Sequence, residues 1–394
     1  MTDIAILYDR SESDELGIKL TAEQMGIELS YLPFYKVAFG FDRGGFDFRT
    51  TGKDYTRNLS ETRVVLNRGQ SKNRRIFASM IIESLGKQGV NPLEVELACQ
   101  SKMRSLLAFM SHGVNIPRTV YIPCNVLEET GAGGGKDNTE AIRDLIELEL
   151  GSEGVVVKPD AGTHGRGVAL ARGRGELVDI LQSLHPGITN PVGVVAQQLV
   201  DKWFYDLRII VSKEKGRTPI CQPVALVRGG FKEFRTNTFL GNMVFHVNLP
   251  ERVLRDAEKC GVALAGDSPA WLIALDAMPD IGDAKTVEES ELRSRFQSLD
   301  APFAEVTKAK IDPNKKTSFE AYSRNVEKAY LEYKVTTAYQ FIQKTVQDSL
   351  ERTADRVMFH EGNSCPEFWE QTRIVAGINV AEHLLRCALS LLDR

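Results

Sequence analysis

Three glycines lie within six positions, between two short apolar runs. The first run, at 155–157, is β-branched and ends at Lys158, and the second starts at Val168. This pattern predicts a strand, a flexible loop and a second strand. Glycine leaves backbone N–H groups open to an anion, and Lys158 adds a cation at the base of the loop. The loop therefore suits the phosphates of a nucleotide. Its glycines are Gly162, Gly165 and Gly167.

Two common phosphate-binding loops do not fit this stretch. A P-loop opens a helix with Gly-Lys-Ser/Thr, and a dinucleotide fingerprint places its glycines at a strand-to-helix turn. Here the chain returns to a strand. On the loop alone, an ordinary glycine-rich hairpin explains the pattern about as well as a nucleotide site does. A second motif is needed to decide between them.

That motif is the segment from Met358 to Pro366. Alternation along a strand puts Glu361 and Asn363 on one face, and their oxygens suit a hard cation such as Mg²⁺. On the same alternation His360 points to the opposite face. Asp276, after an apolar run, is a third candidate metal ligand. The sequence therefore predicts a metal site in addition to a phosphate loop.

The order of loop, lysine and acidic strand resembles the ATP-grasp superfamily, and within it the RimK-type carboxylate-amine ligases. These include ribosomal-protein glutamate ligases and LysX-like ligases. Their Glu-x-Asn-x-x-Pro pattern fits residues 361–366, which read Glu-Gly-Asn-Ser-Cys-Pro. The resemblance runs, with gaps, over most of the chain. It implies an α/β (α+β) protein, with an ATP-grasp fold and an N-terminal pre-ATP-grasp α/β domain.

The resemblance also implies which residues contact ATP. Ser101 caps a predicted helix, and Lys102 matches the family's lysine that reaches the phosphates. Residues 192–200 match the strand under the adenine, and Asp206 is preferred to Asp201 for the ribose. The implied ATP-contacting residues are Lys102, Lys158, Gly162, Thr163, His164, Gly165, Gly167, Gln198, Leu199, Val200 and Asp206.

Catalytic roles are implied for Arg208, Arg235 and Asn237, which match positions that serve the transferred phosphate and the acyl phosphate. Guanidinium groups suit such anions. A surface salt bridge is the alternative interpretation of any single arginine. The implied metal ligands are Asp276, Glu361 and Asn363, with Mg²⁺ as the ion and Mn²⁺ as an alternative.

Composition limits the class of protein. A chain of 394 residues exceeds one typical core, and 42% hydrophobic with 26% charged residues is ordinary for a globular protein. A net charge of -4 gives no general attraction to nucleic acid or anionic membrane. The acidic N-terminal start and the lack of a long apolar run lead us to expect a cytoplasmic protein. Six cysteines without a CxxC pair are expected to be reduced and mostly buried.

Three domains are expected. They are a pre-ATP-grasp domain at 1–97, a central ATP-grasp subdomain with the glycine-rich loop at 98–200, and a C-terminal ATP-grasp domain with the metal site at 201–394. Strands at 4–8, 27–32 and 64–67 and a helix at 13–25 suggest an α/β layer.

Arg68 ends the strand at 64–67, where α/β folds place ligand groups, so it is a candidate substrate contact. Lys72, Arg74 and Arg75 are interpreted as a solvated charge run. The glycine-rich stretch at 130–137 is expected to be a linker.

The two predicted metal carboxylates are 85 positions apart (361 minus 276), whereas the family keeps them close in sequence. Residues 280–355 therefore look like an insertion. It is polar to about residue 316, and 319–351 predict one or two amphipathic helices. The insertion either shapes an acceptor site or an oligomer contact, or is helical padding. A closing helix is expected at 372–392.

These features favour an ATP-dependent ligase that joins a small-molecule or peptide carboxylate to an amine acceptor through an acyl phosphate. A carrier protein is one candidate partner, and we expect a homo-oligomer without nucleic acid or membrane as partners. The alternative is an ATP-grasp nucleotide-binding protein with kinase-like or regulatory activity. A hydrolase is disfavoured because the chain lacks a Gly-x-Ser-x-Gly elbow.

Overall fold

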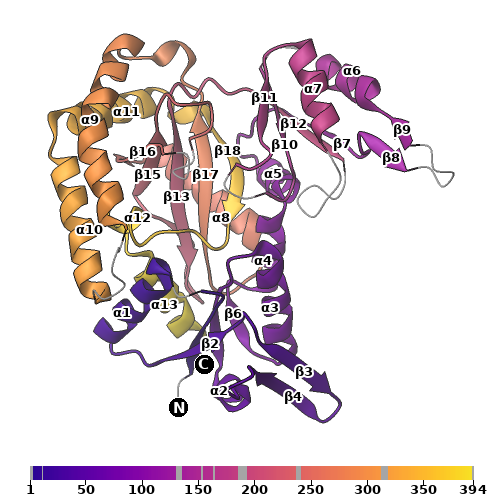
Figure 1. The fold of residues 1–394 in the computed structure, drawn as a ribbon, viewed down its shortest axis with the longest axis vertical. Coiled ribbons are helices and arrows are strands. Elements are labelled where there is room, and N and C mark those ends of the chain that lie inside the picture. The colour runs from indigo at the N-terminus through magenta and orange to yellow at the C-terminus, as the bar shows by residue number, and fades with distance from the viewer. Residues whose placement is uncertain are drawn as a thin grey trace.

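The structure is a computed structural model that describes residues 3–10, 12–129, 135–151, 154–162, 165–184, 193–236, 241–311 and 318–392. Within these residues, three larger sheets follow one another along the chain, each with its own helices (Figure 1). The N-terminal sheet lies at the bottom of that view, the central sheet at the upper right and the C-terminal sheet in the middle.

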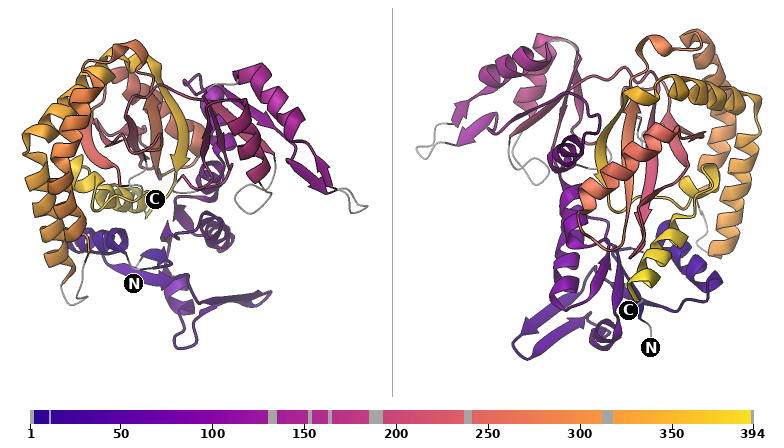
Figure 2. Two further views of the ribbon diagram at one scale, coloured as in Figure 1. Left: turned by 45° about the horizontal axis from the view of Figure 1, so that its top comes forward. Right: turned by 180° about the vertical axis from the view of Figure 1, so that it is seen from behind.

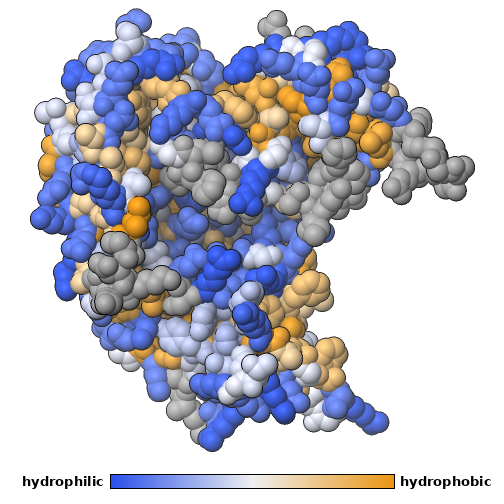
Figure 3. Space-filling view, in the orientation of Figure 1, coloured by the Kyte–Doolittle hydropathy of each residue, from blue (hydrophilic) through white to orange (hydrophobic). Residues whose placement is uncertain are grey.

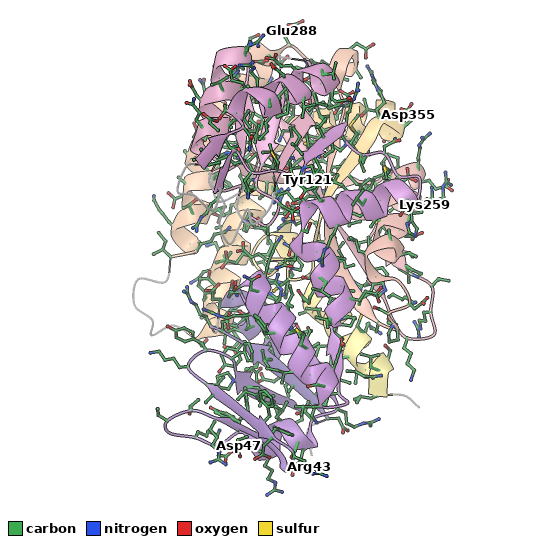
Figure 4. The ribbon with its side chains drawn as sticks, turned by 90° about the vertical axis from the view of Figure 1, so that its right-hand side faces the viewer. Arg43, Asp47, Tyr121, Lys259, Glu288 and Asp355 are labelled. Atoms are coloured by element: carbon green, nitrogen blue, oxygen red, sulfur yellow. The ribbon has the colours of Figure 1, made fainter. Side chains whose placement is uncertain are left out.

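The N-terminal sheet is parallel, with strand order β2-β1-β5-β6. The strands are β1 (Ile4–Tyr8), β2 (Leu29–Pro33), β5 (Val64–Arg68) and β6 (Gln88–Val90), and the helices are α1 (Ser13–Gln24), α2 (Thr56–Glu61), α3 (Lys72–Ser84) and α4 (Leu93–Gln100). The strands and the helix predicted here are confirmed. A hairpin of β3 (Ala38–Asp42) and β4 (Gly45–Arg49) projects from this unit, with Arg43 and Asp47 marking its tip in Figure 4.

The central sheet is antiparallel, with order β11-β10-β12-β7. Its elements are α5 (Lys102–Ser111), β7 (Thr119–Ile122), α6 (Thr139–Leu150), β10 (Val155–Lys158), β11 (Ala169–Ala171), α7 (Arg174–Ser183) and β12 (Val194–Gln198). Strands β10 and β11 pair across the glycine-rich loop, which confirms the predicted hairpin.

The expected linker at 130–137 is wrong in part. Residues 130–134 lie outside the described residues, but β9 (Gly135–Asp137) pairs with β8 (Leu127–Glu129). Backbone pairing does not depend on side chains, so a glycine-rich composition did not reveal this hairpin.

The C-terminal sheet is antiparallel, with order β16-β15-β13-β17-β18 and β14 paired to β13. Its strands are β13 (Tyr205–Lys213), β14 (Ile220–Cys221), β15 (Val224–Gly229), β16 (Met243–Asn248), β17 (Trp271–Pro279) and β18 (Val357–Asn363). Helix α8 (Glu251–Ala265) buries its apolar stripe in the same core.

The closing helix is interrupted. It divides into α12 (Thr372–Val375) and α13 (Val380–Leu392), because Gly377 adopts a φ of 73°, which ends a right-handed helix. Helix α13 packs against α1 and joins the two ends of the chain in one core that includes Ile18 and Leu385.

The insertion forms α9 (Glu289–Ala309), α10 (Phe319–Lys334) and α11 (Thr337–Arg352), which lie at the left of Figure 1 and cover one face of the C-terminal sheet in the views of Figure 2. The amphipathic helices predicted at 319–351 are confirmed as α10 and α11. Helix α9 occupies a stretch interpreted only as polar, and it buries Leu292, Phe296 and Leu299. This spacing is helical, but charged residues around it hid the pattern.

Within the described part of the chain, no helix combines the length and apolar character that crossing a bilayer requires. All six cysteines are free thiols, and four of them are buried, as predicted: Cys99, Cys221, Cys260 and Cys387.

Gly17 tests the packing of α1 on the segment after β18. A methyl group at Gly17 would lie 2.1 Å from Cε3 of the buried Trp369. We expect Gly17→Ala to lower the free energy of unfolding by about 1–3 kcal/mol in urea denaturation, although alanine favours helix. Gly175→Ala is the matched control, because among the described residues no atom beyond its chain neighbours and its own helix backbone lies within 4 Å of the added methyl group. A Gly17→Ala variant as stable as the wild type would contradict this packing.

Candidate active site

A cavity of about 390 Å³ is lined by side chains from all three sheets. Blue, hydrophilic residues and an orange, hydrophobic patch lie side by side where the central unit meets the rest of the molecule (Figure 3). Most of the predicted site residues line the cavity: Arg68, Lys102, Lys158, Gly162, Gly165, Gln198, Leu199, Val200, Asp206, Arg208, Arg235, Asp276, Glu361 and Asn363. Thr163, His164 and Asn237 lie outside the described residues.

The glycine-rich loop has the backbone that its sequence predicts. Gly165 and Gly167 have φ values of 68° and 71°, which favour glycine. Gly167 does not itself line the cavity, among the residues that the structure describes. The guanidinium Nη1 of Arg235 donates to the carbonyl of Gly165 at 2.9 Å, and its other nitrogens pair with Glu233. Arg235 therefore holds the loop to the C-terminal unit.

Helix α5 is attached to the other side of the loop. Ser101 caps it by accepting from the backbone N–H of Arg104, as predicted. Asp160, just before the glycines, accepts from Ser101 Oγ at 2.8 Å and from the backbone N–H of Met103 at 2.9 Å. This places Lys102, the first residue of the helix, beneath the loop, where its Nζ reaches the loop carbonyls at 3.4 Å.

The acidic strand lies beside its predicted partner. In the β17–β18 register Asp276 stands directly opposite Glu361, although 85 positions separate them in sequence (361 minus 276). Cross-strand neighbours of an antiparallel pair point to the same face. Glu361 Oε1 contacts Lys72 Nζ at 3.3 Å and Lys102 Nζ at 4.0 Å. Burial alone would raise the pKa of Glu361, but the two lysines lower it to about 2.

The prediction that His360 points away from Glu361 is wrong, because His360 also lines the cavity. The register shifts there: Asp276 pairs with Glu361 and Ala277 pairs with Phe359, which leaves His360 as the extra residue of a β-bulge. Strict alternation fails at a bulge. Burial and the nearby Lys158 lower the pKa of His360 to about 4, so the ring is neutral, and its buried Nε2 has no hydrogen-bond partner among the described atoms.

A buried charge network continues across the C-terminal sheet. Arg208 binds both oxygens of Asp276 at 3.0 Å. Arg228 bridges two carboxylates, with Nε 2.7 Å from Asp206 and Nη2 3.1 Å from Asp276. Burial would raise the pKa values of both aspartates, but the arginines lower them.

Sequence reasoning missed Arg228, Lys202 and Thr236. Lys202 donates to Thr236 Oγ1 at 2.7 Å, and Thr236 in turn donates to Asp206. Burial lowers the pKa of Lys202 to about 8. One signal was available in the sequence: Arg228 follows an apolar run and precedes two glycines, much as Arg68 follows the run at 64–66 and precedes Gly69.

The apolar side of the cavity lies at the end of β12. Val156, Val168 and Met278 line it together with Leu199 and Val200, and this composition suits a planar base. Gln198 also lines the cavity, with its amide 3.9 Å from the sulfur of Met358.

The N-terminal unit supplies the opposite wall. Arg68 is 3% exposed and donates to Asp14, Glu15 and the carbonyl of Pro366, each at 3.3 Å. Arg68 lines the cavity as predicted, but its hydrogen bonds connect α1 to the segment after β18.

The interpretation of Lys72 and Arg75 as solvated is wrong. Arg75 is buried and donates to Glu96 at 2.9 Å, and Lys72 contacts Glu361. Arg74 is half-exposed and pairs with Asp9, so it alone resembles the expected surface run. A charge run in sequence hides which side chains meet distant carboxylates.

The insertion does not enter this site, since no described residue at 280–355 lines the cavity.

Of the three predicted metal ligands, Glu361 and Asn363 suit a divalent ion better than Asp276 does. Within the described ranges, no group of three or more acidic, histidine or cysteine side chains could hold a metal. Lys72 and Lys102 contact Glu361 through Oε1, whereas arginines bind both oxygens of Asp276. Mg²⁺ commonly takes one or two protein oxygens and completes its shell with phosphates and water. Glu361 and Asn363 fit that pattern, and the metal role of Asp276 stays a prediction.

Comparisons with known proteins agree with this geometry. Residues 101–267 match the family model of the RimK-like ATP-grasp domain. The chain is 23% identical over 281 residues to the alpha-aminoadipate–LysW ligase LysX of Sulfurisphaera tokodaii, covering 70% of this chain and 85% of that relative.

Two solved structures show the fold. D-cycloserine synthetase DcsG is similar with a TM-score of 0.57 at 13% identity, covering 98% of this chain and 99% of that one. Macrocyclase MdnC from Microcystis aeruginosa, bound with its precursor peptide MdnA, is similar with a TM-score of 0.53 at 15% identity. The match covers 99% of this chain and 100% of that one.

The fold is therefore ATP-grasp, and the protein is an ATP-dependent ligase of the class that joins a carboxylate to an amine. Within that class, residues 101–267 match the RimK-like domain and the chain is similar to LysX, which agrees with the resemblance that the motifs indicated. ATP-grasp ligases use ATP together with a divalent metal.

The buried charge network predicts a stability effect. Arg228→Met would leave Asp206 and Asp276 with one cation fewer inside the protein. We expect the free energy of unfolding to fall by about 3–5 kcal/mol in urea denaturation. Arg235→Met is the matched control, because this side chain is partly exposed and its carboxylate partner Glu233 can be solvated. Equal losses in the two variants would contradict the role of burial.

Lys158 predicts a pH dependence. Burial and the neighbouring Lys102 lower its pKa to about 8. Phosphate binds the ammonium form, so ADP affinity should be constant below pH 8 and fall above it, by up to about tenfold per pH unit for one lysine. Calorimetry of ADP binding at several pH values between about 6.5 and 9.5, a range that spans this pKa, measures the affinity. In Lys158→Arg the ADP affinity should fall less steeply above pH 8, with a remaining slope from the titration of Lys202. Equal slopes in the variant and the wild type would contradict the role of Lys158 in phosphate binding.

Proposed function

We propose that this enzyme activates a carboxylate as an acyl phosphate with ATP and transfers the acyl group to an amine. What supports the proposal is the convergence of cations on one cavity beside Glu361 and Asn363. Both reactants of the first step are anions, and their approach needs positive charge at the point where they meet.

The first step joins two anions in line. A carboxylate oxygen attacks the γ-phosphorus of ATP, the bond from that phosphorus to the β,γ-bridging oxygen breaks, and ADP leaves. We assign Lys102 and Lys158 to the phosphates, with backbone N–H groups of the glycine-rich loop. Leu199 and Val200 would lie on the adenine, and Asp206 near the ribose. Mg²⁺, with Mn²⁺ as an alternative, would neutralise phosphate charge from a position beside Glu361 and Asn363.

The second step forms the amide. The amine nitrogen attacks the acyl carbon, the C–O bond to phosphate breaks, and inorganic phosphate and a proton leave. Arg235 and Arg208 are assigned to the developing oxyanion and the departing phosphate, where a guanidinium binds two oxygens at once. Asn237 is assigned to the same group.

The substrates follow from chemistry and from relatives. The N-terminal wall carries Arg68 and Lys72 for a carboxylate, and Asp14 of this wall and Glu367 of the segment after β18 also line the cavity and suit a cationic amine. The LysX relative is named for α-aminoadipate and the protein LysW. We therefore propose an amino acid as one substrate and a peptide or carrier protein as the other.

Hydroxylamine tests the acyl phosphate, because it replaces the amine and traps the acyl group as a hydroxamate. We expect ATP-dependent hydroxamate with at least one of glutamate, aspartate, α-aminoadipate and N-acetylglutamate. Glu361→Gln should reduce the rate by about 10²-fold or more, as expected for loss of metal-centred charge stabilisation.

Glu332→Gln, an exposed carboxylate on α10, is the matched control and should keep the wild-type rate. Circular dichroism would check that each variant folds. ADP release that needs the carboxylate but not hydroxylamine, without hydroxamate, would favour a kinase-like protein instead.

A further inference from the structure

Lys72 connects the N-terminal sheet to the acidic strand β18. Its Nζ donates to the carbonyls of Cys99 at 3.1 Å and Gln100 at 3.3 Å, and to Glu361 Oε1 at 3.3 Å. The two carbonyls end helix α4, where the helix dipole favours a cation. The end of α4 therefore holds Lys72 against Glu361.

Lys72 and Lys102 approach Glu361 from different parts of the molecule. Lys102 hydrogen-bonds to the carbonyls of Asp160 and Gly162, so it belongs to the phosphate-loop side. Lys72 belongs to α3 of the N-terminal unit. In an in-line transfer the attacking carboxylate lies on the side of the γ-phosphate away from ADP. The phosphate assignments of the proposed function would put Lys72 on that side.

The other cations of the N-terminal wall already have carboxylate partners. Arg68 pairs with Asp14 and Glu15. Arg75 pairs with Glu96 at 2.9 Å. Among the described residues, the one carboxylate in salt-bridge contact with Lys72 is Glu361, which the proposed function assigns to the metal. A divalent ion at Glu361 would leave Lys72 facing the cavity without an anion.

We propose that Lys72 is a catalytic residue that exchanges partners: it neutralises Glu361 in the metal-free enzyme and binds the substrate carboxylate once Glu361 holds a divalent ion. This inference rests on the proposed function. It predicts that one cation links metal binding to carboxylate binding, because its ammonium cannot serve both anions fully at the same time.

The metal side of the exchange is tested without turnover. Mn²⁺ binding in the presence of ADP is measured by the electron paramagnetic resonance of free Mn²⁺. Lys72→Met should bind Mn²⁺ about threefold tighter or more, because a cation that competes for Glu361 is lost. Lys72→Arg should stay close to the wild type. Unchanged or weaker Mn²⁺ binding by Lys72→Met would overturn the proposal.

The carboxylate side is tested in the hydroxamate assay with glutamate and with α-aminoadipate. Lys72→Met should raise the KM for the carboxylate about tenfold or more and leave the KM for ATP within about twofold. Lys72→Arg should restore part of the loss. An unchanged carboxylate KM, or an equal rise in the KM for ATP, would overturn the proposal.

Arg74→Met is the matched control, because Arg74 lies on the same helix, pairs with Asp9 and does not line the cavity. It should match the wild type in both assays, and thermal unfolding would show whether each variant is folded. If the wild type forms no hydroxamate with either carboxylate, the proposed function fails for these substrates, and the Mn²⁺ measurement alone decides the exchange of partners.

Discussion

Removing an ion from water costs several kcal/mol in a protein interior unless an opposite charge lies beside it. This chain concentrates that requirement in one cavity, where lysines and arginines from three sheets meet. Asp206 and Asp276 neutralise the arginines of the C-terminal sheet. Lys158 has no carboxylate in salt-bridge contact among the described residues, and burial together with the neighbouring Lys102 lowers its pKa. A polyphosphate would supply the negative charge that this side of the cavity lacks.

The positions of these charges depend on strand register rather than on sequence distance. Arg208 faces Asp276 across β13 and β17, and Asp276 faces Glu361 across β17 and β18. One face of the sheet thus carries an arginine and two carboxylates side by side on three neighbouring strands. The insertion leaves after β17 and returns at β18, and its helices pack on the sheet's core without altering the pairing that builds the site. In Figure 4 Glu288, just before α9, lies at the end of the molecule opposite Arg43 and Asp47.

Local patterns predicted the elements and part of the site. Period-two alternation placed Glu361 and Asn363 on one face, and glycine spacing placed the hairpin. The orientation of His360 was predicted wrongly because one β-bulge changes which residues of the strand share a face. The buried ion pairs of Lys72 and Arg75 were not predicted because their partners, Glu361 and Glu96, are distant in sequence. In sequence, a buried run of basic residues looks the same as a solvated one. Arg228 has partners on two other strands, and no local pattern shows such a network.

The contact between Lys72 and Glu361 spans 289 positions of the chain. Domains of a growing polypeptide generally fold from the N-terminal side as synthesis proceeds. The parallel sheet, the glycine-rich hairpin and the inserted helices can all form before strand β18 leaves the ribosome. A nascent chain therefore has no acidic strand at its centre until residue 361 emerges, and the core that α1 shares with α13 is completed only after that.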